Sequence, residues 1–138
     1  MDAYREQSAC VRCIVDWYGP TDIGKMNFYP SVQDHIGPES PEGCVIGGKK
    51  VLENPDLAEA TVPMNYLERD KETPPLLIMH GGSDMLVPFN QSCRLYEKMK
   101  ELDKTVEFVK LVGANHGFGG FNCEEALDAV EEFIRKYI

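Results

Sequence analysis

Two residues able to do acid–base chemistry follow apolar runs in this sequence. Asp84 comes directly after PPLLIMHGGS (residues 74–83), and His116 lies in the glycine-rich stretch GANHGFGGF (residues 113–121). An Asp hydrogen-bonded to a His is the orienting half of a nucleophile–base–acid triad, because the carboxylate fixes the imidazole tautomer and the imidazole takes a proton from a hydroxyl nucleophile. From spacing alone, a turn Asp and a solvent-exposed loop His remain the alternative interpretation.

The elements that must position these two residues follow a β-α-β-α pattern. Apolar runs at residues 11–20, 74–81 and 105–113 predict buried strands, and the prolines of the second run bound it. Residues 90–104 predict an amphipathic helix with Leu95, Met99 and Leu102 on one face and Asn90 as N-cap. Residues 123–138 predict a second helix, whose apolar face comprises Ala126, Leu127, Val130, Phe133, Ile134 and Tyr137.

This pattern predicts an α/β fold with about three parallel strands and flanking helices. Catalytic groups in such sheets gather beyond the carboxyl ends of the strands, so Asp84 and His116 are expected to meet there. Asp16 and Asp22 follow the first strand and are alternative acids. Trp17 and Tyr18 end that strand, where they would belong to the core or line an acyl pocket.

Three further motifs have weaker functional interpretations. Cys10 and Cys13 form a C-x-x-C that enters a predicted strand, where positions i and i+3 point to opposite faces, so no metal site is expected. The HGG at residues 80–82 resembles a lipase oxyanion motif but is not followed by a nucleophile, so His80 is expected to be a packing residue at the strand end. The glycines at 117–120 lack dinucleotide-binding spacing and leave nucleotide binding a minor alternative.

Four segments in order resemble the α/β-hydrolase fold, in its esterase/lipase branch that includes bacterial feruloyl- and acetyl-esterase-like proteins. They are VRCIVDWYGPTD, ATVPMNYL, PPLLIMHGGSDMLVPFNQS and GANHGF. The resemblance implies that Asp84 is the catalytic acid and His116 the catalytic base of a carboxylic-ester hydrolase that needs no cofactor or metal. Asn115 stands where that family often has Gly. The implied substrate is a small ester, such as a sugar or aryl ester.

The family's nucleophile motif, Gly-x-Ser-x-Gly, does not occur in these 138 residues. The chain is therefore expected to be a single partial domain, residues 1–138, that corresponds to the C-terminal half of the fold and is inactive alone. Residues 20–73 are an irregular insertion with one short helix at NPDLAEA. The alternative function is a truncated, non-catalytic module derived from a hydrolase, which self-associates or binds a partner.

The charge and cysteine content of the chain limit the kinds of partner and cellular location to be expected. A net charge of −9 disfavours nucleic acid and anionic membranes, and no apolar run is long enough to span a bilayer. Five irregularly spaced cysteines suit reduced thiols, so a cytoplasmic location is expected. A small sheet of apolar strands has two open edges, which predicts a homo-oligomer, most simply a dimer, or coverage by a missing N-terminal half.

Overall fold

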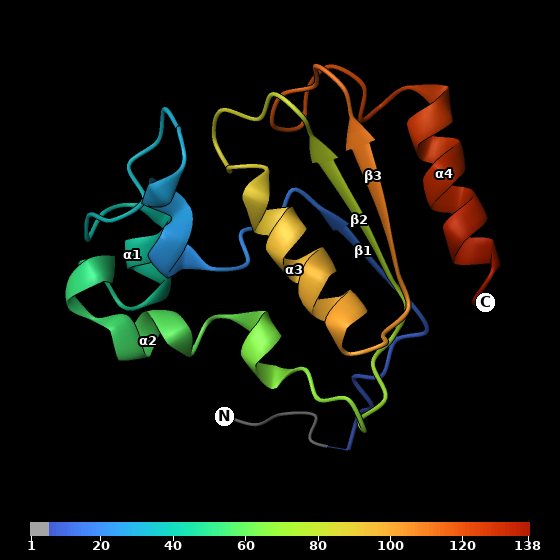
Figure 1. Cartoon of the computed structure of the whole chain (residues 1–138), viewed down its shortest axis with the longest axis horizontal. Coiled ribbons are helices and arrows are strands. Elements are labelled where there is room, and N and C mark those ends of the chain that lie inside the picture. Colours follow the sequence, from blue (N-terminus) through green and yellow to red (C-terminus); the bar gives the residue numbers. More distant parts are fainter. Residues whose placement is uncertain (1–5) are drawn as a thin grey trace.

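The computed structural model describes residues 6–138, which fold around a parallel sheet in the order β1-β2-β3. The strands are β1 (Ile14–Trp17), β2 (Leu76–Gly81) and β3 (Val106–Leu111). Central β2 is buried along its whole length, as its unbroken apolar sequence predicts. All three strands run in one direction, so their carboxyl ends lie at the same edge, at the top of Figure 1. The predicted three-strand α/β architecture is therefore confirmed.

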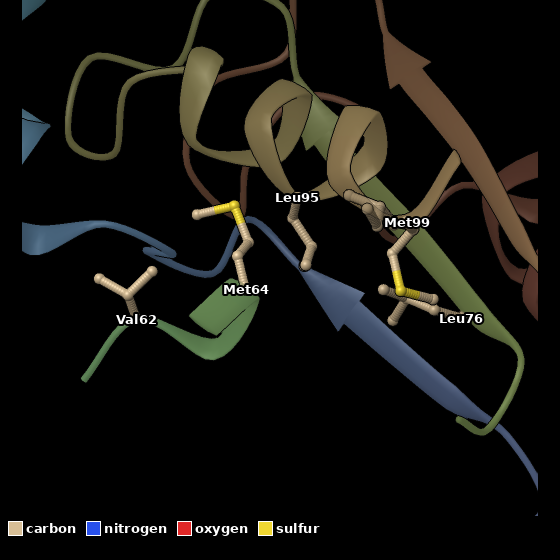
Figure 2. Packing of buried hydrophobic residues seen from close by; sticks show 6 residues of the cluster. Val62, Met64, Leu76, Leu95 and Met99 are labelled. Carbon is tan, nitrogen blue, oxygen red and sulfur yellow. The ribbon is translucent and has the colours of Figure 1, made fainter. Parts of the chain in front are cut away.

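Alternate side chains of β2 supply two cores on opposite faces of the sheet. Leu76 and Ile78 pack against α3 (Asn90–Glu101), and Figure 2 shows Leu95 and Met99 of α3 above Leu76. Leu77 and Met79 belong to the cluster on the other face, which includes Phe133 of α4 (Glu124–Arg135). The period-two alternation of a strand thus fixes the two helices on opposite faces.

The segment between β1 and β2 holds short helices rather than irregular chain alone. These are η1 (Ile23–Phe28), α1 (Pro41–Val45), η2 (Val51–Glu53), α2 (Pro55–Glu59) and η3 (Pro63–Tyr66). Helix α2 confirms the helix predicted at NPDLAEA. In Figure 1, α1 and α2 lie to the left of α3, away from α4.

A buried amide joins this segment to α3. Oε1 of Gln91 accepts from the backbone N–H groups of Thr21 (2.9 Å) and Asp22 (2.7 Å), and the Thr21 hydroxyl donates to the Gln91 carbonyl (2.7 Å). The chain that leaves β1 is thereby fixed against the start of α3, near the carboxyl edge of the sheet.

Two details of the predicted helices are wrong. Asn90 is not the N-cap of α3, because the helix starts one residue earlier than predicted: Phe89 takes the cap position and Asn90 is the first helical residue. Leu127 is 47% exposed instead of buried on α4. At about 100° per residue, Leu127 lies roughly 90° from the centre of the face formed by Ala126, Val130 and Phe133, which turns its side chain toward solvent.

The open edge of β1 is only partly covered. Ile14 is 40% exposed, and an apolar pocket of about 340 Å³ lies beside β1, between the strand and the side chains of Leu67 and Leu95.

Within residues 6–138, no helix has the length and hydrophobicity needed to cross a membrane.

Candidate active site

Asp84 and His116 meet beyond the carboxyl ends of β2 and β3. The Nδ1 of His116 lies 2.9 Å from Oδ2 of Asp84, and the imidazole is 27% exposed while the carboxylate is completely buried. A carboxylate at Nδ1 holds the proton on that nitrogen and leaves Nε2 with a free lone pair. The sequence-predicted pair is thus brought together with the geometry of an orienting acid and a base.

The Asp84 carboxylate is held rigidly by its own turn. Its Oδ1 accepts from the backbone N–H groups of Leu86 (2.8 Å) and Val87 (2.9 Å). With Oδ1 engaged twice, Oδ2 is directed at His116. An ionised carboxylate in this position stabilises an imidazolium at His116.

His80 has a larger role than the packing expected for it. Its ring is fully buried, with Nε2 at 3.0 Å from the Val87 carbonyl and 3.2 Å from Oδ2 of Asp84. Because a carbonyl can only accept, Nε2 carries a proton, and the Ser92 hydroxyl donates to Nδ1 across 2.6 Å. Burial lowers the pKa of His80, so the neutral ring braces the acid turn without adding a charge.

The His116 loop is fixed by its neighbours. Oδ1 of Asn115 accepts from the backbone N–H groups of Met85 (3.0 Å) and His116 (2.8 Å), which ties this loop to the acid turn. This gives a structural reason for Asn at the position where Gly is common. The ring of Tyr18 lies 4.2 Å from the His116 ring, centroid to centroid, and Tyr18 has a positive φ of 48° that turns it out of β1.

The glycines of HGG serve backbone packing. A Cβ on Gly81 would lie 2.4 Å from the Ala114 carbonyl oxygen, so only glycine permits the His116 loop to approach β2. The backbone N–H of Gly82 donates to the Leu111 carbonyl oxygen (2.8 Å), and the backbone N–H of Ser83 donates to the Ala114 carbonyl oxygen (2.9 Å). These donors are occupied, which argues against an oxyanion hole here.

The alternative acids, Asp16 and Asp22, have partners other than His116. Asp16 accepts from the backbone N–H of Gly19 at 3.1 Å, and burial raises its pKa. Asp22 bonds Arg94 at 2.7 Å and Lys25 at 3.1 Å. Among the described residues, Asp84 alone provides a carboxylate hydrogen-bonded to His116.

A second chain of polar groups, which sequence reasoning missed, lies next to the acid turn. The Ser31 hydroxyl is 2.8 Å from Nε2 of His35, and Nδ1 of His35 is 2.9 Å from Oε1 of Glu42. Ser31 also lies 2.9 Å from the Leu86 carbonyl, and the Val32 N–H donates to Met85 (2.8 Å). The spacing of four and seven residues, across a loop and the start of α1, gave no signal for this arrangement.

Ser31 does not resemble a nucleophile, despite its His and Glu. Its oxygen accepts from the Gln33 N–H (3.1 Å) and faces the carbonyl oxygens of Met85 (3.2 Å) and Leu86 (2.9 Å), which would repel a developing oxyanion. None of the other serines within residues 6–138 hydrogen-bonds to His116. Each one either has another hydrogen-bond partner or, in the case of Ser83, lies exposed in the acid turn; these serines are Ser8, Ser40, Ser83 and Ser92.

A pocket of about 390 Å³ opens beside His116. One side is formed by Trp17 and Tyr18 at the end of β1, and the other by Gln33, His35 and Glu42. Trp17 and Tyr18 also pack on the core cluster that contains Phe121, which confirms the core role expected for them; that the pocket holds an acyl group stays a prediction.

No metal site accompanies the pair in the part of the chain that the structure describes. No group of three or more His, Cys, Asp or Glu side chains there is arranged to hold an ion. Cys10 and Cys13 are both free thiols.

Comparison with curated sequences points to esterases. Residues 1–99, which include Asp84 but not His116, match the BD-FAE family model. The chain is 31% identical over 89 residues to esterase LipQ of Mycobacterium tuberculosis, which covers 62% of this chain and 21% of LipQ. The chain therefore spans about a fifth of the length of this curated relative.

Comparison with solved structures extends the similarity to nearly the whole chain. A truncated form of a carbohydrate esterase from gut microbiota superposes with a TM-score of 0.80 at 30% identity, over 96% of this chain and 45% of that one. The bifunctional GH43-CE of Bacteroides eggerthii gives a TM-score of 0.78 at 28% identity, over 96% and 18% of the two chains. An acylaminoacyl peptidase of Pyrococcus horikoshii, at 17% identity and a TM-score of 0.67, shares the fold. The chain belongs to the BD-FAE family, an esterase-like family of α/β-hydrolases, and resembles the C-terminal half of that fold.

Proposed function

We propose that this chain supplies the acid, Asp84, and the base, His116, of a serine-dependent carboxylic-ester hydrolase. The nucleophile and the oxyanion-hole donors would come from residues outside these 138. The observation that supports this most strongly is the 2.9 Å contact between a buried, doubly anchored carboxylate and a partly exposed imidazole. Membership of an esterase-like family agrees with it.

The geometry suits each proton transfer of ester hydrolysis. Nε2 of His116 would take the proton as a serine oxygen attacks the ester carbonyl carbon. The tetrahedral intermediate then expels the alcohol, which leaves with that proton, and water cleaves the acyl-enzyme by the same route. Asp84 stabilises the imidazolium in both steps.

The proposal predicts that the isolated chain is inactive on small esters. Loss of the nucleophile alone lowers turnover about 2 × 10⁶-fold in a serine protease. The purified chain, treated with a fluorophosphonate probe and assayed with p-nitrophenyl acetate, should show neither labelling nor turnover above buffer. Stoichiometric labelling of one serine would overturn this statement and identify a nucleophile within the chain.

Activity should appear once a nucleophile half is present. Residues 6–138 can replace the matching segment of the truncated gut carbohydrate esterase, to which they superpose over nearly their whole length. We expect this chimera to hydrolyse p-nitrophenyl acetate. A folded chimera that retains the nucleophile but is inert would contradict the proposed function.

The second candidate is a non-catalytic module that self-associates. The open edge of β1, with Ile14 40% exposed and an apolar pocket beside it, supports this possibility because an unpaired strand edge can add a second strand. Light scattering separates the two candidates. A dimer that Ile14→Lys converts to a monomer would favour self-association, whereas a monodisperse monomer would dismiss it.

A further inference from the structure

We propose that Ser31 is a positioning residue for Asp84, the acid of the pair, and that His35 directs the proton of its hydroxyl. In this assignment, Ser31 holds the acid turn, residues 84–87, in the conformation that aims the carboxylate at His116. The consequence for turnover rests on the proposed function, whereas the consequence for the conformation of the turn concerns this chain alone.

The Ser31 hydroxyl contacts the same two peptide groups that hold Asp84. Oδ1 of Asp84 accepts from the backbone N–H groups of Leu86 and Val87. The carbonyl oxygens of these two peptide groups belong to Met85 and Leu86, and they lie 3.2 Å and 2.9 Å from Oγ of Ser31. Because a peptide group is planar, with its N–H and C=O on opposite sides, a rotation that takes a carbonyl away from Ser31 also takes the N–H away from Asp84.

The Ser31 hydroxyl has a single proton, so its role depends on the direction of its hydrogen bond to His35. A hydroxyl offers one donor and two acceptor positions. Oγ accepts from the Gln33 N–H at 3.1 Å and lies 2.8 Å from Nε2 of His35. When the hydroxyl proton points at the Leu86 carbonyl, the second acceptor position of Oγ is filled by a proton on Nε2. An unprotonated Nε2 would instead take the hydroxyl proton away from the turn.

Glu42 makes a protonated Nε2 possible. Oε1 of Glu42 is 2.9 Å from Nδ1 of His35, and the side chains of His35 and Glu42 are only 2% and 6% exposed. A contact this short between a ring nitrogen and a carboxyl oxygen contains a proton. The buried pair therefore holds either an imidazolium with a carboxylate or a neutral imidazole with a carboxylic acid. In both arrangements Nε2 donates to Ser31.

The role of the hydroxyl can be isolated from the docking of the loop. The backbone N–H of Val32 donates to the Met85 carbonyl at 2.8 Å, so Ser31→Ala keeps one hydrogen bond between the loop and the turn. Ser31 is half-buried, and within residues 6–138 it is not part of the lining of the pocket beside the base. We therefore expect Ser31→Ala to fold and to leave that pocket unchanged.

NMR on the isolated chain tests the assignment. Long-range ¹H–¹⁵N spectra, at a pH where the His116 ring is neutral, should show a protonated Nε2 on His35 in the parent chain. In Ser31→Ala, the ratio of the Nδ1–H to the Nε2–H tautomer of His116 should fall at least about fivefold, because Asp84 is no longer fixed toward the ring. Ser8→Ala, an exposed serine that precedes β1, should keep the ratio of the parent.

Either of two results would overturn the assignment: an unprotonated Nε2 on His35 in the parent chain, or an unchanged His116 tautomer ratio in folded Ser31→Ala. Should Ser31→Ala fail to fold, the state of Nε2 in the parent chain still decides it.

The chimera with a nucleophile half separates this inference from the proposed function. There, Ser31→Ala should lower kcat for p-nitrophenyl acetate at least about fivefold and leave KM within about twofold, because the variant changes the base and not the pocket. An inert parent chimera would remove the esterase proposal, while the tautomer ratio would still test the role of Ser31. An active parent chimera whose kcat is unchanged by Ser31→Ala would remove the positioning role and keep the esterase.

Discussion

The buried carboxylate of Asp84 should contribute to folding and to base chemistry in separable ways, and two substitutions distinguish them. In Asp84→Ala, the backbone N–H groups of Leu86 and Val87 lose their acceptor. Hydrogen bonds to a charged group contribute about 1.5–3 kcal/mol each. Val87 is buried, so its N–H bears the full loss, whereas Leu86 is 37% exposed and water replaces part of its bond. We therefore expect about 3 kcal/mol of destabilisation.

Asp84→Asn should behave differently. Its carbonyl oxygen can still accept from Leu86 and Val87, so the expected cost is only about 1 kcal/mol. The amide NH₂ would then face Nδ1 of His116, which must become an acceptor, and the ring proton would move to Nε2. That tautomer cannot take a proton from a nucleophile. The variant is thus expected to be folded but to hold the wrong tautomer.

Two measurements on the isolated chain test this reasoning. Urea unfolding gives the free-energy differences, and long-range ¹H–¹⁵N NMR of His116 gives the tautomer at a pH where the ring is neutral. Asp84→Ala within 1 kcal/mol of the parent would show that the carboxylate does not hold the turn. An Asp84→Asn variant with the proton still on Nδ1 would show that Asp84 does not orient the base.

Three further predictions concern the framework around the pair. Gly81→Ala should destabilise the fold by about 1–3 kcal/mol in urea unfolding, because the new Cβ would lie 2.4 Å from the Ala114 carbonyl oxygen. In the control Gly24→Ala, the new Cβ would come no closer than 3.6 Å to a side chain beyond its chain neighbours, and the expected cost is less than about 1 kcal/mol. Equal costs for the two variants would contradict the close approach of the His116 loop to β2. Met99→Ala should lower the free energy of unfolding by about 2–5 kcal/mol, because the Met99 side chain is buried, at 1% exposure. Leu127 is 47% exposed, so Leu127→Ala should change the free energy of unfolding by no more than about 0.5 kcal/mol. Similar losses for both variants would contradict the observed orientation of α4. Asp16→Asn should raise the melting temperature at pH 7, because burial raises the pKa of Asp16 and the folded state bears the cost of its charge. As the pH falls through the raised pKa toward 3.8, the carboxyl of the parent chain becomes protonated, and the difference in melting temperature between variant and parent should vanish. A gain in melting temperature that persists at pH 4 would contradict this origin.

The sequence was most informative where local pattern and topology agree. The unbroken apolar run of β2 identified the central strand, and parallel order then required residues after β2 and β3 to meet at one edge. Asp84 and His116 could be paired for that reason. Their catalytic roles stay proposals that the experiments above test.

The groups that the sequence did not reveal are joined across irregular chain. Ser31, His35 and Glu42 approach one another because the loop folds back on the acid turn, and no periodicity reports such a path. His80 was interpreted as packing because its polar partners, Ser92 and the Val87 carbonyl, lie beyond the strand that contains it. The cap of α3 was misplaced for a related reason: Asn90 is an intrinsically favourable N-cap, but the preceding turn already begins the helix.

The most direct test of the account is the role of His116 in the chimera that combines residues 6–138 with a nucleophile half. The measurement is kcat/KM for p-nitrophenyl acetate in the parent chimera, in His116→Ala, and in Lys98→Gln as a remote control. We expect His116→Ala to lose at least about 10³-fold while the control keeps its rate. A folded His116→Ala chimera with activity within tenfold of the parent would contradict the assignment of His116 as the base.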